Sequence, residues 1–137
     1  MQLLNSSQYA IRILGYIANH DNQQLCSAKE LSEALTIPYK FLTKIMIKLV
    51  NADLIISIRG REGGYKLSKP ASEITIIEIL NHFNEFAEDT QCILGIGSCN
   101  HKNKCALHDQ WVKPKSMINK MFENTTLADI DSEIFKL

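Results

Sequence analysis

The sequence predicts a mainly α-helical protein with one small β-hairpin and a long C-terminal helix. Apolar residues recur at helical spacing through most of the chain, and one short β-branched stretch is followed by closely spaced glycines. The 137 residues, 45% of them hydrophobic, suffice for one domain and one extra element. No apolar run is long enough to cross a bilayer and no signal-peptide core is visible, so we expect a cytoplasmic protein without a membrane partner.

The first part of the chain predicts three helices. The first runs from about Ser7 to Asn19 and ends at a polar stretch. Ser27-Ala-Lys-Glu30 has the pattern of a capping box and opens a short second helix. Thr36-Ile-Pro38 is a break, and a longer helix follows from about Tyr39 to Ala52. A short helix, a tight turn and a second helix make a helix-turn-helix, whose second helix normally enters the major groove of DNA.

A basic hairpin comes next. Ile55–Ile58 and Tyr65–Leu67 are expected strands, and glycines in the connection, residues 59–64, permit the positive φ angles of a hairpin tip. A helix-turn-helix followed by such a hairpin is a winged helix. Residues 40–69 hold seven basic and two acidic residues, a net charge of +5 in a chain of net charge zero. A concentrated basic face attracts phosphate, although an ordinary solvated surface would explain the charge alone.

We therefore expect this winged head to bind double-stranded DNA. Its second helix would lie on the groove, and the arginines of the wing would reach a phosphate or the narrow minor groove. The residues expected to contact DNA are Ser27, Tyr39, Lys40, Thr43, Lys44, Lys48, Arg59, Gly60 and Arg61.

Two more helices are expected after the hairpin. Thr75-Ile-Ile-Glu78 is a second capping-box pattern and opens the first of them. A last helix is expected at about 104–124, kinked or interrupted at Pro114. Its apolar stripe has no room in so small a head, so the natural partner is the same helix of a second subunit. The residues expected at this homodimer interface are Leu107, Trp111, Ile118, Met121 and Phe122.

Three of the four cysteines, Cys92, Cys99 and Cys105, crowd one segment, and His108 follows. Cys105 and His108 are three residues apart at a helix start, so they share a face and can converge on a metal. Soft thiolates suit zinc or an iron–sulfur cluster. The closely spaced cysteine pair that is usual in structural zinc sites is missing here, which favours iron–sulfur without deciding the matter. Cys26 is expected to be a small buried residue.

Several stretches together resemble the Rrf2 family of bacterial winged-helix transcriptional regulators, in particular the iron–sulfur type typified by IscR and NsrR. The resemblance covers nearly the whole chain, and the combination is specific where no single piece is. The stretches that carry it are Tyr9-Ala-Ile-Arg-Ile-Leu, Ile37-Pro-Tyr-Lys-Phe-Leu-Thr-Lys-Ile, Arg59-Gly-Arg-Glu-Gly-Gly-Tyr-Lys-Leu, Lys69-Pro-Ala-Ser-Glu-Ile-Thr-Ile, Lys104-Cys-Ala-Leu-His-Asp-Gln-Trp111 and Thr126-Leu-Ala-Asp129.

The resemblance implies a homodimer that binds an inverted-repeat operator and holds an iron–sulfur cluster through Cys92, Cys99 and Cys105. His108 matches the fourth ligand of one type of relative. Other relatives use an acidic residue where this chain has Gln8, a poor anionic ligand. A [2Fe-2S] cluster is favoured and a [4Fe-4S] cluster is the alternative. The gap between the first two cysteines is one residue longer than is common, which leaves the cluster type open. Some relatives have Glu where this chain has Thr43, which implies a different base preference.

The expected organisation is a DNA-binding domain at 1–85, a cluster-binding loop at 86–108, a dimerisation helix at 104–125 and a C-terminal tail at 126–137. The expected function is that of a repressor that senses nitric oxide, redox state or iron–sulfur status through the cluster. One alternative is a winged-helix regulator with structural zinc. A second, a cluster-bearing redox protein, finds little support, because the sequence shows no substrate-pocket motif or nucleotide-binding loop; we expect no enzyme.

Overall fold

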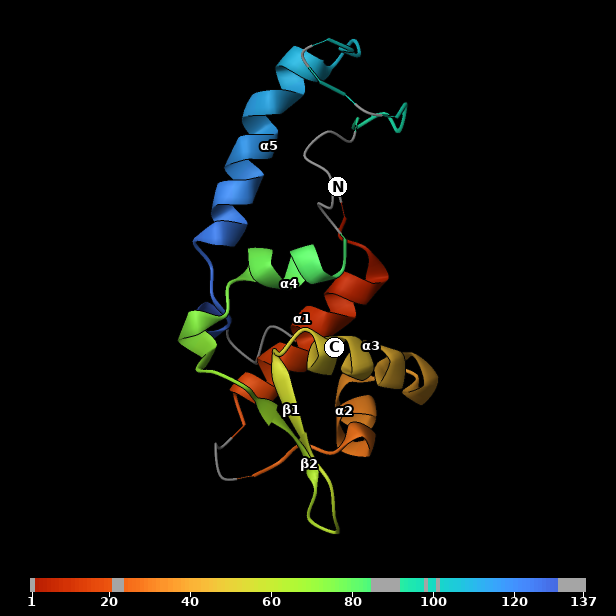
Figure 1. Cartoon of the computed structure of the whole chain (residues 1–137), viewed down its shortest axis with the longest axis vertical. Coiled ribbons are helices and arrows are strands. Elements are labelled where there is room, and N and C mark those ends of the chain that lie inside the picture. The colour runs from red at the N-terminus through yellow and green to blue at the C-terminus, as the bar shows by residue number, and fades with distance from the viewer. Residues whose placement is uncertain (1, 21–23, 85–91, 98, 101, 131–137) are drawn as a thin grey trace.

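The computed structural model describes residues 2–20, 24–84, 92–97, 99–100 and 102–130. Its element order confirms the expected fold class, a mainly helical chain with one two-stranded hairpin. The long helix α5 (His108–Glu123) projects from the head, so that the hairpin and the loop before α5 lie at opposite ends of the long axis (Figure 1). Within the described ranges, no helix has the length and apolar character that crossing a membrane requires.

Three helices build the core of the head. They are α1 (Asn5–Ala18), α2 (Ala28–Leu35) and α3 (Tyr39–Asn51). The bounds of α1 and α3 lie within two residues of those expected, and α2 begins directly after its expected cap, Ser27. Each is amphipathic, because its apolar residues recur at intervals of three and four and therefore share one face. The apolar side chains with no exposed surface that these helices contribute are Ala10, Ile13, Leu14, Leu31, Leu42 and Leu49.

The helix-turn-helix is held together by short local hydrogen bonds. Ser27 caps α2, because its Oγ accepts a hydrogen bond from the Glu30 amide at 3.1 Å. Helix α2 is followed by its cap residue Thr36, whose φ of 53° is left-handed. The Ser32 hydroxyl donates to the Ile37 carbonyl at 2.6 Å across the turn. Pro38 precedes α3 as its cap residue rather than occupying the first helical position.

The wing is an antiparallel hairpin of β1 (Ile55–Ile58) and β2 (Gly64–Leu67), with Ile55 opposite Leu67. The second strand begins one residue earlier than expected. Its outer edge is also paired, because Cys26 and Tyr65 exchange two backbone hydrogen bonds of 3.1 and 2.8 Å. The base of the wing is thus fastened to the chain just before α2.

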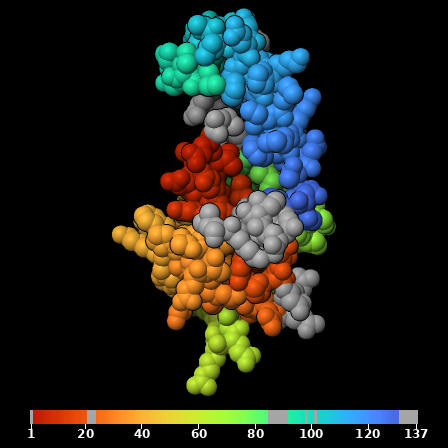
Figure 2. Space-filling model, turned by 180° about the vertical axis from the view of Figure 1, so that it is seen from behind, coloured from red at the N-terminus to blue at the C-terminus, as the bar shows by residue number. Residues whose placement is uncertain are grey.

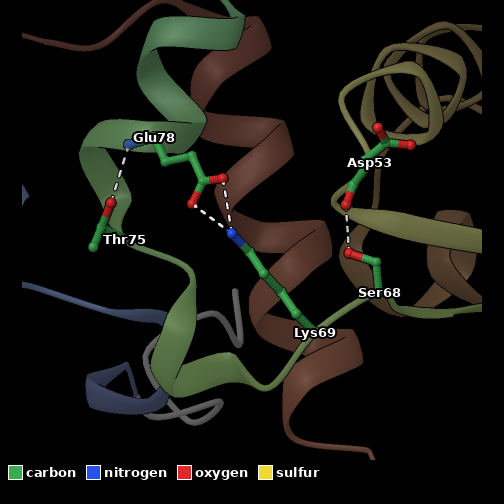
Figure 3. Close-up of polar contacts among 5 residues, drawn as sticks. All are labelled: Asp53, Ser68, Lys69, Thr75 and Glu78. Carbon is green, nitrogen blue, oxygen red and sulfur yellow. Dashed lines mark hydrogen bonds and ion pairs between the residues drawn. The ribbon is translucent and has the colours of Figure 1, made fainter.

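Two side-chain interactions hold the exit of the wing (Figure 3). The Ser68 hydroxyl donates to the Asp53 carbonyl, and Lys69 Nζ lies 3.0 and 3.2 Å from the two carboxylate oxygens of Glu78. Glu78 stands in the first turn of α4 (Ile76–His82), where Thr75 Oγ1 accepts from its amide at 3.3 Å. The second capping box is therefore half formed, since the Glu78 carboxylate pairs with Lys69 instead of its own helix cap.

Helix α5 begins four residues later than the expected start at Lys104. A turn comes first, in which the His108 amide donates to the Cys105 carbonyl at 3.1 Å. The helix then continues through Pro114 to Glu123, so the expected interruption does not occur. Proline removes a single intrahelical hydrogen bond, and here it stands on an exposed helix, where the other bonds keep the helix continuous.

The chain returns to the head after α5. The Leu127 amide donates to the Ile74 carbonyl and the Ile76 amide to the Thr125 carbonyl, both at 2.9 Å. Leu127 opens the short helix η2 (Leu127–Asp129) and has no exposed surface, because it packs into the core of the head. Residues 126–130, expected to begin a tail, therefore complete that core.

A complete capping box starts η2, in contrast to the half-formed box at α4. The Thr126 amide and hydroxyl both donate to Asp129 Oδ2, at 2.8 and 3.0 Å. These donors stabilise the carboxylate and lower the pKa of Asp129. The return segment thus has its own local structure in addition to its contacts with the head.

Candidate nucleic-acid interface and metal centre

The outer face of α3 presents aromatic and basic side chains to solvent. Tyr39 and Phe41 are 56% and 52% exposed, and Lys40 and Lys44 are exposed beside them. The tip of the wing, residues 59–62, is exposed and protrudes from the head, as the space-filling view shows (Figure 2). The structure thus leaves Tyr39, Lys40, Lys44 and the wing arginines accessible.

Three of the residues expected to contact DNA have other contacts as well. Ser27 is exposed and caps α2. Thr43 is half-buried and its hydroxyl donates to the Lys40 carbonyl at 3.0 Å. Lys48 places its Nζ 5.4 Å from the centre of the Phe83 ring, a cation–π distance, so its ammonium is directed toward α4.

The shape of the wing tip depends on its glycines. Gly60 has a φ of 122°, which L side chains rarely adopt. The Gly63 amide donates to the Gly60 carbonyl at 3.0 Å and closes the turn. A Cβ atom on Gly63 would collide with the carbonyl oxygen of Ile58. The tight tip therefore requires glycine at position 63.

Arg12 is a structural residue of the head that the sequence analysis missed. Its guanidinium donates to the Leu35 carbonyl at 2.6 Å and lies 5.9 Å from the centre of the Tyr9 ring. It thereby satisfies a carbonyl at the C-terminal end of α2 and ties α1 to the helix-turn-helix. The available signal was an arginine in the otherwise apolar middle of α1.

The structure brings the expected metal ligands together beside the start of α5. The Sγ atoms of Cys92, Cys99 and Cys105 all lie within 4.8 Å of one another. Cys99 Sγ is 3.9 Å from Cys105 Sγ and 2.9 Å from His108 Nδ1, a hydrogen bond whose donor depends on the imidazole tautomer. The four residues come from a loop, a turn and the first residue of a helix.

A hollow of about 400 Å³ adjoins these sulfurs and is lined by all three cysteines. The backbone amide of Leu94 is the main donor that lowers the pKa of the Cys92 thiol, followed by the Cys105 thiol and the amide of Ile96. The pKa of Cys105 is raised, chiefly because its thiol donates to Cys92. The amide donors therefore favour a thiolate at Cys92, the form that binds soft metals.

The apolar residues of α5 have little cover within one chain. No residue of α5 is buried. Met121 is 53% exposed, and Val112 and Met117, which the sequence analysis did not single out, are 51% and 62% exposed. Phe122 differs, because it packs against the core of its own head. Of the other expected interface residues, Leu107 is exposed, and Trp111 and Ile118 are half-buried.

The comparison with protein families decides the identity of the chain. The model of the Rrf2 family, described as an iron-dependent transcriptional regulator, matches residues 3–133. The chain belongs to the Rrf2 family. It is therefore a transcriptional regulator rather than an enzyme, and membership implies DNA binding.

Rrf2 relatives match over most of their length. The NsrR regulator of Oceanobacillus iheyensis is 32% identical over 131 residues, which cover 95% of this chain and 89% of the relative. The IscR regulator of Vibrio campbellii is 30% identical over 139 aligned positions, covering 100% and 82%. The solved structure of CymR, the global cysteine regulator of B. subtilis, superposes with a TM-score of 0.79 at 21% identity and covers 94% and 95%, which shows a shared fold.

Proposed function

We propose that this Rrf2 chain is a homodimeric repressor that binds a palindromic operator in the cytoplasm and senses nitric oxide, redox state or iron–sulfur status through a bound cluster. The observation that carries the proposal is the convergence of the Cys92, Cys99 and Cys105 thiols at one end of α5, with His108 beside Cys99. The other end of α5 continues into Leu127 in the core of the head. One helix thus joins the metal centre to the DNA-binding domain.

The donor set fits an iron–sulfur cluster. Three thiols and an imidazole are soft and borderline ligands, and the adjoining hollow of about 400 Å³ leaves room for a group larger than one ion. The cluster would supply a centre that reacts with nitric oxide and oxidants. The chain itself would hold this centre through the four residues and shield it with the loop at 92–97.

The apolar side chains on α5 support the dimer. Val112, Met117 and Met121 lie exposed along a helix that projects away from the head. A second copy of α5 would remove these side chains from water, and two copies of the chain would then present two recognition helices to the two halves of a palindrome. In this arrangement, a change at the metal centre moves α5 and with it the heads.

Purification without oxygen, followed by visible spectroscopy and by iron and sulfide counting, tests the cofactor. Operator binding is then measured before and after treatment with nitric oxide. A coupling of roughly 1–3 kcal/mol would change the affinity about 5–150-fold. Equal affinities would refute the sensor and leave DNA binding intact. The matched variant is Cys92→Ser, which should remove both the colour and the response.

A structural zinc ion is the second candidate, and the compactness of the thiols favours it. A tetrahedral site with Zn–S bonds of about 2.3 Å places its sulfurs roughly 3.8 Å apart. Cys99 and Cys105 already have a sulfur–sulfur distance of 3.9 Å. Colourless protein that contains one zinc per chain after anaerobic purification would select this candidate over the cluster.

A further inference from the structure

A second group of metal-binding side chains lies at the base of the wing. His20 Nε2 is 3.1 Å from Glu30 Oε1, and the Tyr16 hydroxyl donates to the same oxygen at 3.1 Å. The ligand atoms of His20, Cys26 and Glu30 all lie within 4.8 Å of one another. Cys26 is fully buried, whereas the side chains of His20 and Glu30 are 28% and 37% exposed.

The backbone fixes each of these three residues. The His20 amide donates to the Ile17 carbonyl at 3.2 Å just beyond α1. Cys26 is held by its backbone pairing with Tyr65 of β2, and Glu30 stands in the first turn of α2. In a full capping box the Glu30 carboxylate would fold back on the cap, but here it reaches across to α1. The group is therefore built from three separate elements.

We propose that His20, Cys26 and Glu30 form a second metal site that takes one divalent ion of the zinc type. Sulfur, nitrogen and carboxylate oxygen are the donors that zinc uses, and three protein ligands leave a fourth position for water. A thiolate disfavours Mg²⁺ and Ca²⁺, which prefer oxygen ligands. Binding displaces the proton of the Cys26 thiol to solvent, and the sulfur, the imidazole and the carboxylate each donate one lone pair to the ion.

An ion can reach the site from solvent. His20 lines a surface hollow of about 360 Å³ that Gln24 also borders. Lys66 and Lys69 border the same hollow, and Lys69 is paired with Glu78. These ammonium groups repel an approaching cation, and the negative charges of a thiolate and a carboxylate at the site offset this repulsion. The Tyr16 ring packs against the His20 ring, with the ring centres 4.9 Å apart and the planes tilted by 31°, and so helps to orient the imidazole.

The bound ion would connect three parts of the DNA-binding head. It would join the end of α1 to the start of α2, and through Cys26 to β2 of the wing, because Cys26 and Tyr65 are paired. The site is separate from the thiols beside α5. It gives the head a binding site for a metal that does not depend on the cluster.

The test uses the full chain with Cys92, Cys99 and Cys105 all changed to Ser, so that Cys26 is the only remaining thiol. This parent is titrated with Co²⁺ without oxygen. We expect the parent to bind one Co²⁺ per chain. The complex should show a thiolate-to-cobalt charge-transfer band in the near ultraviolet and the visible bands of a tetrahedral site. One equivalent of Zn²⁺ should displace the Co²⁺ and raise the midpoint of thermal unfolding, because it binds the folded state.

Two half-exposed ligands give variants that keep the core intact. His20→Gln and Glu30→Gln should each weaken Co²⁺ binding at least tenfold and abolish the rise in the unfolding midpoint. His82→Gln and Glu33→Gln make the same chemical changes at exposed positions and should behave like the parent. Absence of the charge-transfer band in the parent would overturn the proposal, as would unchanged affinity in both ligand variants.

Discussion

Removal of the Leu127 side chain tests whether the segment after α5 belongs to the head. Leu127 has no exposed surface and belongs to the apolar core of the head, where η2 lies against α1 and residues 71–73. Changing it to Ala leaves a cavity that the surrounding core fills only in part. Buried leucines that become alanine cost about 2–5 kcal/mol, so we expect Leu127→Ala to lower the free energy of unfolding by about 3 kcal/mol.

Urea unfolding followed by circular dichroism measures this loss. With a urea dependence of about 1–3 kcal/mol/M, the midpoint should fall by roughly 1–3 M. All variants are compared at one protein concentration, because the proposed dimer would make the midpoint depend on concentration. Leu4→Ala is the matched control: its side chain is 54% exposed, and the same change there should cost about 0.5 kcal/mol or less. If the two variants lose equal stability, Leu127 does not complete the core.

Three further predictions concern the wing and its base. Arg61→Ala should reduce the slope of log affinity for DNA against log salt concentration by about 1 if Arg61 contacts one phosphate. Lys113→Ala, at an exposed position on α5, should leave the slope unchanged. An unchanged slope for Arg61→Ala would refute the phosphate contact. Gly63→Ala should weaken operator binding about tenfold, because its Cβ would strike the Ile58 carbonyl and displace the wing tip, with no comparable loss in Ser57→Ala. Burial, and then the charge of a nearby carboxylate, raise the pKa of the Cys26 thiol from 9.0 to about 11. The stability that depends on the neutral Cys26 thiol is therefore fully present below pH 9 and is lost between about pH 9 and 11, by up to about 2.7 kcal/mol. Urea unfolding at pH 8 and 11 should show this loss in the unchanged protein but not in Cys26→Val.

The local patterns of the sequence were sufficient for most elements of the fold. Ser27 and Thr75 cap helices where the capping-box pattern placed them. Each side-chain oxygen accepts a hydrogen bond from the backbone amide three residues later, so the interaction depends on local sequence alone. The glutamates of the same two patterns were misleading. Both carboxylates bind side chains from other elements, and a local pattern carries no information about a partner that only the tertiary fold brings near.

The candidate sites were predictable to different degrees. Cys92, Cys99 and Cys105 stand close in sequence, so a short loop is sufficient to bring their sulfurs together. The sequence offers no reason to expect a metal site at His20 and Cys26. Their third ligand, Glu30, comes near them only because α2 packs against α1. Leu127 was assigned to the expected tail because its partner, Ile74, is distant in the sequence. The turn that brings Leu127 back to Ile74 follows a long projecting helix, and no local sequence pattern indicates that the chain returns to the head there.

The return of Leu127 also determines when the head can finish folding during synthesis. Its backbone partner, Ile74, leaves the ribosome 53 residues earlier, which at about 5–20 residues per second corresponds to roughly 3–10 s. In that interval the head presents an apolar gap where Leu127 will lie, while the cysteines and α5 are still being made. A growing chain therefore acquires the thiols of the candidate metal centre before its DNA-binding domain is closed, and the proposed metal loading can precede the first moment at which the protein is competent to bind DNA.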